Sequence, residues 1–208
     1  MTKENIYFDY ENKNKWKFPR KYYNQTRLDF LKENILKLNK GSKILDMGCG
    51  SGDMTCIFHD DYRVFGLDNC KEAIEYCNKS YRKAEYKLGD LYNTGYEDES
   101  FDAIILTDVI EHLYNPQKAL SEIRRVLKPK GTLLLTTPNY SSITWILIEQ
   151  TWFRFFGGNC KPYKRDIHPS KFTKKKLINL LRFNFPNTNV ETICYGLCLT
   201  TVAKKSID

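Results

Sequence analysis

Long hydrophobic runs, internal repeats and paired cysteine motifs are all missing from this sequence. No stretch of its 208 residues approaches the roughly 20 consecutive apolar residues that cross a bilayer, and residues 1–10 lack the apolar core of a secretory signal peptide. The seven cysteines include no CxxC pair, which argues against a zinc ribbon, and their odd number favours free thiols over a disulfide framework. These absences lead us to expect a cytoplasmic enzyme or binding domain.

The net charge is +8, but the two signs are separated along the chain. Residues 1–43 carry +6, residues 44–140 carry −5 and residues 141–208 carry +7. The basic terminal segments on either side of an acidic central segment could bind an anionic partner. They fit equally well a lysine-rich surface without such a partner, so the charge distribution leaves both interpretations open.

Apolar periodicity predicts strands and helices that alternate along most of the chain. After a polar arm over residues 1–19, a helical apolar stripe predicts a helix over residues 22–38 that Gly41 ends. Strands are then expected at 43–47, 63–67, 85–88, 101–107 and 132–137, and helices at 53–59, 70–80 and 116–127, with a turn at 129–131. This alternation implies a parallel sheet covered by helices on both faces.

The alternation stops after Pro138. The elements expected beyond it are a helix over 141–156, a basic loop over 159–170, a helix over 173–181 and a hairpin of two strands, 190–195 and 197–203, around Gly196.

A glycine-rich loop follows the first expected strand and is the strongest functional signal. Gly48, Gly50 and Gly52 lie between this strand and the next helix, where glycine permits a tight turn and the close approach of a ligand to the backbone. Asp68 ends the second strand, 22 residues after Asp46. An acidic residue at this separation can accept hydrogen bonds from ribose hydroxyls, so the pattern indicates a bound adenosine.

The spacing of the loop distinguishes between adenosine ligands. It reads GxGxG, whereas a dinucleotide site prefers GxGxxG with a helix N-terminus facing the pyrophosphate. No lysine follows the loop, which excludes a P-loop. The acidic Asp46 before the glycines suits a cationic ligand better than a diphosphate.

Five motifs, in order, resemble the class I S-adenosylmethionine-dependent methyltransferases over about residues 40–140. The DxGxGxG segment resembles their motif I, and Asp68 matches the acidic residue after the second strand. Asp90, in the segment 88–91, matches the acidic position beside the adenine. The segments 101–105 and 127–135 match the motifs of the fourth and fifth strands. The residues that the resemblance assigns to the cofactor are Asp46, Gly48, Cys49, Gly50, Gly52, Asp68, Asn69, Asp90, Leu91 and Asp108.

The resemblance implies an α/β fold, a Rossmann-like doubly wound sheet of seven mostly parallel strands with a terminal antiparallel strand. Residues 1–40 would add an N-terminal arm and helix. Residues 41–208 would form the methyltransferase domain, with a helical insertion at about 140–170. The implied cofactor is S-adenosylmethionine, with S-adenosylhomocysteine as the product.

Candidate catalytic residues follow the fourth strand and precede the last helix. The segment 107–113 is similar to the subgroup that includes ubiquinone-biosynthesis O-methyltransferases, in which Asp108 would contact the methionine part of the cofactor. Glu111 and His112 could orient or deprotonate an acceptor, although His112 could equally cap or pack the following loop. His168, in a His-Pro and Phe-Thr element, is the second candidate base or a loop-packing residue.

No metal site is expected from the sequence. His59 precedes two aspartates, Asp60 and Asp61, but adjacent residues rarely converge on one ion.

The segment 141–165 has three interpretations. It is rich in large apolar side chains, and Lys161, Lys164 and Arg165 follow its aromatic part. It could be a lid over the acceptor, a helix over 143–165 that meets anionic lipid at a membrane surface, or part of the core or of a dimer face. The chain would be a monomer or a homodimer.

The function we expect is methylation of a small or lipid-linked metabolite, with oxygen as the methylated atom. One alternative is N-methylation of a small molecule or of RNA, and another is a catalytically silent protein that keeps the cofactor pocket. Nucleic acid is the less favoured partner, because the sequence contains no recognised nucleic-acid module and no Asn/Asp-Pro-Pro-Tyr motif.

Overall fold

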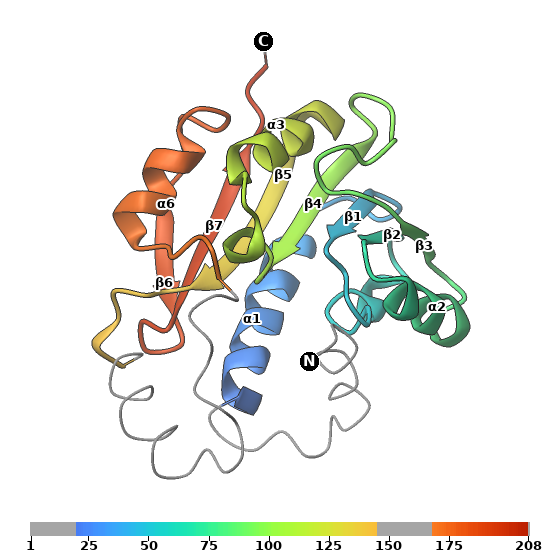
Figure 1. Ribbon diagram of the computed structural model, residues 1–208. Coiled ribbons are helices and arrows are strands. Elements are labelled where there is room, and N and C mark those ends of the chain that lie inside the picture. The colour runs from blue at the N-terminus through green and yellow to red at the C-terminus, as the bar shows by residue number, and fades with distance from the viewer. Residues whose placement is uncertain (1–19, 145–167, 208) are drawn as a thin grey trace.

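A central sheet organises the chain, and its strands follow the order β3-β2-β1-β4-β5-β7-β6 (Figure 1). The computed structural model describes residues 20–144 and 168–207, and within these residues the sheet has seven strands. The strands are β1 (Lys43–Met47), β2 (Arg63–Asp68), β3 (Glu85–Leu88), β4 (Phe101–Thr107), β5 (Leu127–Pro138), β6 (Val190–Ile193) and β7 (Cys198–Lys204). The helices are α1 (Arg20–Ile35), α2 (Lys71–Ser80), α3 (Pro116–Val126) and α6 (Lys174–Leu181), with short 3₁₀ turns η3 (Cys56–Phe58) and η4 (Ile110–His112).

The first five strands run parallel, and β7 pairs antiparallel with both β5 and β6. The predicted doubly wound sheet with a terminal antiparallel strand is therefore confirmed. Strand β4 is almost entirely buried, as expected for a central parallel strand that is covered on both faces.

Helices cover both faces of the sheet with separate apolar layers. On one face, α3 and α6 contribute Leu120, Ile123 and Leu177 to the largest core cluster. On the other face, α1 contributes Leu31 and Ile35, and α2 packs beside the β2–β3 edge. Helix α3 begins with Pro116 after Asn115, whose side chain accepts a hydrogen bond from Lys118 N at 3.1 Å.

The segment after the glycine loop differs from the prediction. The sequence pattern predicts a helix over 53–59, but the structure has turns and only the 3₁₀ turn η3 there. Tertiary contacts explain the difference, because Thr55 Oγ1 donates to the Asp46 carboxylate at 3.0 Å and Tyr81 Oη donates to Asp53 at 2.9 Å. These contacts hold the segment against β1 and the residue that caps the end of α2.

Two boundaries also differ. Helix α1 ends at Ile35 rather than Leu38, because Leu38 N bonds to Ile35 O in a tighter turn. The expected turn at 129–131 lies inside β5 as an irregularity, where Lys130 has a positive φ of 64° and the register with β4 shifts. Beyond Thr144, the helix expected over 141–156 falls outside the described residues.

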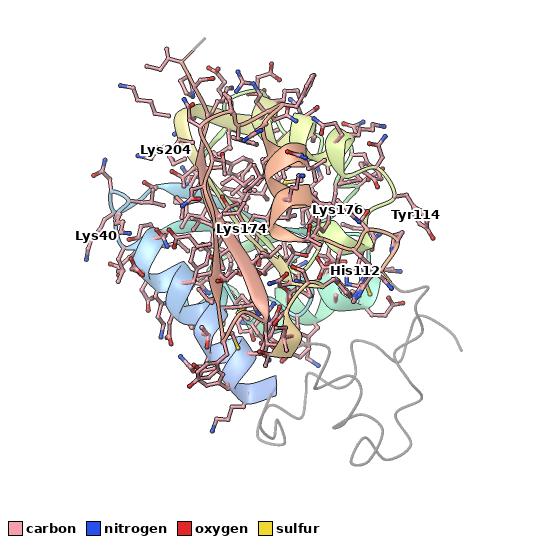
Figure 2. All side chains as sticks on the ribbon, turned by 90° about the vertical axis from the view of Figure 1, so that its left-hand side faces the viewer. Lys40, His112, Tyr114, Lys174, Lys176 and Lys204 are labelled. Carbon is pink, nitrogen blue, oxygen red and sulfur yellow. The ribbon has the colours of Figure 1, made fainter. Side chains whose placement is uncertain are left out.

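Exposed lysines lie on several separate elements. Figure 2 shows Lys40 in the turn after α1, Lys174 and Lys176 on α6, and Lys204 on β7. Among the described residues, no helix combines the length and the hydrophobicity that crossing a bilayer requires.

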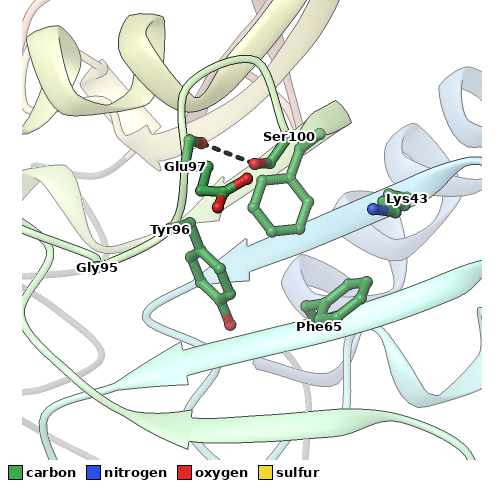
Figure 3. A pocket seen from close by; sticks show the side chains of 7 residues that line it. Lys43, Phe65, Gly95, Tyr96, Glu97 and Ser100 are labelled. Atoms are coloured by element: carbon green, nitrogen blue, oxygen red, sulfur yellow. Dashed lines mark hydrogen bonds between the residues drawn. The ribbon is translucent and has the colours of Figure 1, made fainter.

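A hollow of about 230 Å³ lies at the amino ends of the strands, and Phe65, Tyr96 and Phe101 form much of its wall (Figure 3). The Ser100 hydroxyl donates to Glu97 O at its rim. None of the predicted site residues lines this hollow, because they belong to the opposite, carboxyl edge of the sheet.

Candidate functional site

The glycine loop turns sharply at the carboxyl end of β1. Gly48, Gly50 and Gly52 have φ values of 80°, 50° and 72°, in the left-handed region that favours glycine. A Cβ atom at Gly48 would lie 2.5 Å from the Val109 side chain, which is closer than two non-bonded carbon atoms can approach. The loop therefore depends on glycine for its conformation and for its packing against the segment after β4.

Asp46 lies under this loop with its side chain buried. The residue is 1% exposed, and its Oδ2 accepts a hydrogen bond from Thr55 Oγ1. Its other oxygen, Oδ1, has no hydrogen-bond partner within the described residues. Burial raises the pKa of this carboxyl to about 7, and the charge of Asp68 adds to the effect. A buried, unsatisfied acceptor of this kind fits a ligand that carries positive charge or a hydrogen-bond donor.

Asp68 ends β2 and is fixed against the same loop. Its Oδ2 accepts from Gly50 N at 2.8 Å, and its Oδ1 accepts from Cys70 N at 2.9 Å. Each carboxylate oxygen keeps further acceptor capacity, so these bonds leave room for donors such as ribose hydroxyls. The N-cap of α2 is Cys70, so Asp68 does not occupy the cap position.

The remaining cofactor candidates lie near the ends of β1, β2 and β3. Cys49 is buried, whereas Asn69 and Asp90 are exposed. The Asp90 carboxylate accepts from Tyr92 N at 2.8 Å, and Leu91 packs against the largest core cluster. The structure thus brings these residues to one edge of the sheet, and their contact with a cofactor stays a prediction.

Asp108 follows β4 and is held by helix α1. It has a positive φ of 51°, its carboxylate forms an ion pair with Arg27, and it accepts from Tyr23 Oη at 3.3 Å and from Thr136 Oγ1 at 3.2 Å. The sequence reasoning missed Arg27 and Tyr23. The residues Tyr23, Arg27 and the buried Leu31 follow one another at four-residue spacing, on one face of α1. An arginine on the buried face of a helix needs an acidic partner, so this spacing could have indicated that Arg27 reaches the site.

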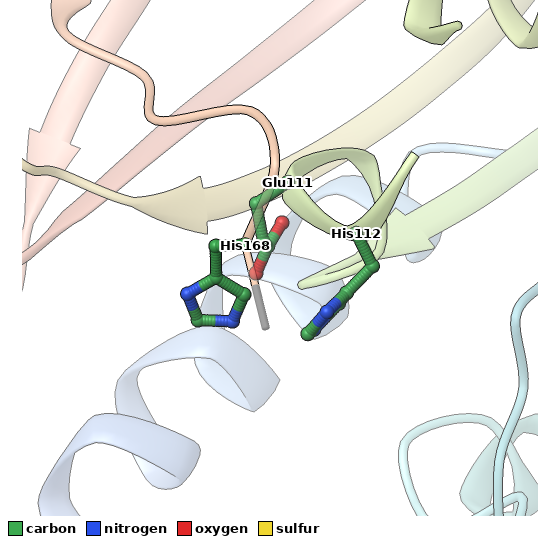
Figure 4. Close-up of side chains that lie close together, drawn as sticks. All are labelled: Glu111, His112 and His168. Atoms are coloured by element: carbon green, nitrogen blue, oxygen red, sulfur yellow. The ribbon is translucent and has the colours of Figure 1, made fainter. Parts of the chain in front are cut away.

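Glu111, His112 and His168 come together from two distant segments. Figure 4 shows the carboxyl group and the two imidazole rings pointing toward one another. The ring centroids of the two histidines are 4.5 Å apart, and one ligand atom from each of the three residues lies within 4.8 Å of the others. Ser170 fixes this arrangement, because its N donates to Glu111 O and its Oγ donates to Leu113 O, both at 3.1 Å.

Two hydroxyl groups from β5 and the residues after it support this cluster. Thr137 Oγ1 donates to Glu111 Oε2 at 2.9 Å, and Tyr140 Oη contacts His168 Nδ1. The sequence reasoning missed both residues, although polar residues at the carboxyl end of a buried strand beside β4 gave a signal for Thr137.

Burial sets the protonation of two members of the cluster. Burial raises the pKa of Glu111 well above its usual value, and the charge of Asp108 raises it further. Burial lowers the pKa of His168 to about 4, with smaller effects from His112 and Lys171. At neutral pH the His168 ring is therefore neutral, whereas burial disfavours the charged form of Glu111.

The acidic residues beside His59 are engaged by lysines. Asp60 pairs with Lys83, and Asp61 pairs with Lys40 at 2.8 Å. The residues 145–165 of the predicted insertion, with Lys161, Lys164 and Arg165, lie outside the described residues.

Comparison with known proteins gives a consistent result. A family described as "Methyltransferase domain" matches residues 45–135. The chain is 30% identical over 158 residues to a demethylmenaquinone methyltransferase of Thermotoga maritima, covering 72% of this chain and 67% of that protein. It is 32% identical over 142 residues to a mitochondrial ubiquinone biosynthesis O-methyltransferase of Rattus norvegicus, covering 60% of this chain but 41% of that protein.

Solved structures share the fold at low sequence identity. A protein of Pyrococcus horikoshii superposes with a TM-score of 0.71 at 21% identity, covering 97% of both chains. A SAM-dependent methyltransferase of Methanosarcina mazei gives a TM-score of 0.65 at 22% identity, covering 85% of this chain and 98% of that one.

Proposed function

Because the chain belongs to the class I S-adenosylmethionine-dependent methyltransferases, we propose that it methylates a small or lipid-linked metabolite at oxygen. S-Adenosylmethionine is its cofactor, and S-adenosylhomocysteine is the product. The names of the Thermotoga and rat relatives support a small acceptor, and the name of the rat relative supports oxygen as the methylated atom.

The residues around the glycine loop are suited to hold the cofactor. Asp46 offers a buried acceptor atom without a hydrogen-bond partner in the described part of the chain, and Asp68 offers acceptor capacity at the end of β2. When bound, the cofactor supplies a methyl group on a positively charged sulfur. Negative charge at Asp46 and Asp68 favours binding of such a cation. The loop glycines allow the backbone to approach it closely.

The observation that carries the oxygen assignment is the cluster of Glu111, His112 and His168. Glu111 and His112 lie in the turn η4 after β4, and Val109, two residues before Glu111, packs on Gly48 of the glycine loop. An alcohol or phenol must lose a proton to become a good nucleophile, and an imidazole beside it can accept that proton. His112 is exposed and can meet an acceptor, whereas His168 is buried behind it.

Catalysis also requires alignment of the acceptor with the methyl group. The ion pair of Arg27 with Asp108 and the bonds from Ser170 keep the two sides of the cluster in place. Orientation of reacting groups contributes up to about 7–11 kcal/mol in favourable cases. Proton transfer to a general base adds to this contribution from alignment.

A methyl-transfer assay with phenol, catechol and amine acceptors tests this function. We expect methylation at oxygen, and His112→Gln should lower kcat by about 10²–10⁴ while the affinity for S-adenosylhomocysteine is unchanged. His59→Gln is the matched control and should retain full activity, because His59 lies outside the cluster.

Other outcomes point to the alternatives. Methylation of amines alone would indicate an N-methyltransferase. Cofactor binding without any transfer would indicate a silent binding protein. A loss below tenfold in both His112→Gln and His168→Gln would assign catalysis to alignment alone.

A further inference from the structure

A polar hollow of about 260 Å³ lies at the amino edge of the sheet, opposite the glycine loop, and no step of the proposed function uses it. Three segments that are far apart in the sequence form this hollow: the turn after α1, the start of β4 and residues 128–132 of β5. Its volume is just below the roughly 300–1,000 Å³ of sites for drug-sized ligands, so it suits a small ligand.

The hollow carries positive charge. The lysines that line it are Lys37, Lys128 and Lys130, and Asp102 is the one acidic residue among its described lining, which gives a net charge of +2. The Asp102 carboxylate is already engaged, because its Oδ1 accepts from Lys128 Nζ at 2.7 Å and its Oδ2 accepts from Lys43 N at 2.8 Å. Lys37 pairs with Glu33 at 3.2 Å, but both side chains are exposed, so a bound anion can replace this weak contact.

Neutral hydrogen-bond donors lie among the lysines. The side chains of Asn39, Ser42 and Thr132 line the hollow, and none of them has a hydrogen-bond partner within residues 20–144 and 168–207. An amide and two hydroxyl groups can donate to the oxygens of a ligand. Lysine binds phosphate as a point charge, whereas arginine matches planar carboxylates. A phosphate monoester carries about −1.5 to −2 charges at neutral pH, which complements the charge of the hollow.

Lys130 has a backbone conformation that is uncommon for lysine. It lies in the irregular part of β5 with a φ of 64°, where glycine would fit at lower cost. Backbone hydrogen bonds fix this shape, since Lys130 N donates to Lys205 O at 3.1 Å and Lys205 N donates to Gly131 O at 2.9 Å. Lys130 is exposed, and its ammonium group has no ion-pair partner in the described part of the chain. A strained residue without a stabilising contact of its own points to a function for its side chain.

We propose that this hollow binds the phosphate group of a small phosphate monoester. The Lys130 ammonium supplies charge that no carboxylate of the described fold neutralises, and Asn39, Ser42 and Thr132 supply the neutral donors. The cofactor residues Asp46 and Asp68 lie at the carboxyl edge, so the two ligands can bind at the same time.

Titration of the isotopically labelled full-length protein with inorganic phosphate, at constant ionic strength, tests the site by amide NMR. We expect saturable shifts at residues 37–42 and 128–132 and none at the glycine loop. Lys130→Gln keeps a long side chain without the charge and should raise the Kd for phosphate about 5–10-fold. Lys176→Gln on α6 is the matched control, because it changes the net charge equally outside the hollow and should leave this Kd unchanged.

Lys130→Gly separates phosphate binding from a structural role of the lysine. Glycine adopts a positive φ without steric cost, so this variant should raise the midpoint of thermal unfolding by about 2–4 °C. It should lose phosphate affinity as Lys130→Gln does. A lower midpoint would assign Lys130 to the stability of β5 and would overturn the inference.

Two further probes identify the source of the phosphate. Saturable binding of glycerol phosphate, without binding to vesicles of phosphatidic acid, would indicate a soluble metabolite. Sedimentation with these vesicles that Lys130→Gln abolishes would indicate a lipid headgroup at the same site. The inference fails if inorganic phosphate causes no saturable shifts, if the shifts lie at the glycine loop, or if Lys130→Gln and Lys176→Gln bind phosphate equally.

Discussion

At the scale of single residues, Asp46 combines deep burial with an oxygen atom that nothing in the described protein satisfies. Such an arrangement stabilises a bound cation and destabilises the protein without it, because an unpaired buried charge costs free energy. Functional sites commonly retain groups of this kind. Cofactor binding and the stability of the cofactor-free protein can be measured separately, since the first depends on the cofactor concentration and the second on pH.

Asp46→Asn should stabilise the protein at alkaline pH and weaken cofactor binding. The pKa of Asp46 is about 7 in the folded protein, against an ordinary value of 3.8, so the folded state binds more protons than the unfolded chain between these values. Stability of the unaltered protein is therefore lost as pH rises toward and through 7. The amide removes this loss, and at pH 8 we expect a gain on the order of 2–4 kcal/mol in urea unfolding, which disappears near pH 4.

Parallel stability–pH profiles for the two proteins would contradict this assignment. S-Adenosylhomocysteine binding by calorimetry provides the second measurement, and unchanged affinity would place Asp46 outside the cofactor site.

At the scale of elements, α1 belongs to the site rather than to a detached arm. Its Tyr23 and Arg27 reach the residue that follows β4, and its Leu31 and Ile35 are fully buried under the sheet. The ion pair of Arg27 with Asp108 holds a residue with positive φ, a conformation that aspartate adopts at some cost.

Arg27→Met should destabilise the protein by about 3–5 kcal/mol, because it leaves the partly buried Asp108 without its cation. Adding Asp108→Asn to this variant should recover part of the loss, and urea unfolding of the four proteins gives the coupling between the two residues. Lys37→Met is the matched control, since its ion pair with Glu33 is exposed and should contribute about 0–1 kcal/mol. Additive losses from the two single variants would show that the ion pair does not stabilise this part of the fold.

The sequence predicts strands and helices correctly where the pattern of apolar residues alone determines them. The strands β1 and β4 are short apolar runs, and their boundaries agree with the structure. The prediction of a helix at 53–59 is wrong, because Thr55 and Asp53 are held by residues of β1 and of the segment after α2. A local sequence pattern cannot reveal such contacts between distant residues. Gly48 and Asp68 could be recognised from one motif, whereas the approach of His168 to Glu111 depends on tertiary folding.

At the scale of the whole molecule, the helix before the glycine loop and the strands after it share one folded unit. Leu31 packs in the same core cluster as Ile44, Ile105 and Leu134 from three central strands. Helix α1, which lies before the boundary suggested by the sequence at residues 40 and 41, therefore shares a core with the strands that follow that boundary.

Leu31→Ala should lower the free energy of unfolding by about 2–5 kcal/mol, with a single transition retained. Leu36→Ala is the matched control, because Leu36 is 68% exposed and should change stability by less than about 0.5 kcal/mol. Far-ultraviolet circular dichroism and thiol accessibility, followed in the same urea series, report whether all parts unfold together. A separate early transition in Leu31→Ala would mean that α1 unfolds independently of the sheet.

The antiparallel strand β7 determines when a newly synthesised chain can complete its sheet. It is the last of the described strands to leave the ribosome, yet it lies between β5 and β6. Until then, the N–H and C=O groups of residues 132–138 on that edge of β5 have no strand to pair with. A nascent chain thus exposes an apolar, unpaired strand edge from the synthesis of β5 until that of β7, so chaperone binding at this edge would protect it from aggregation until β7 has been made.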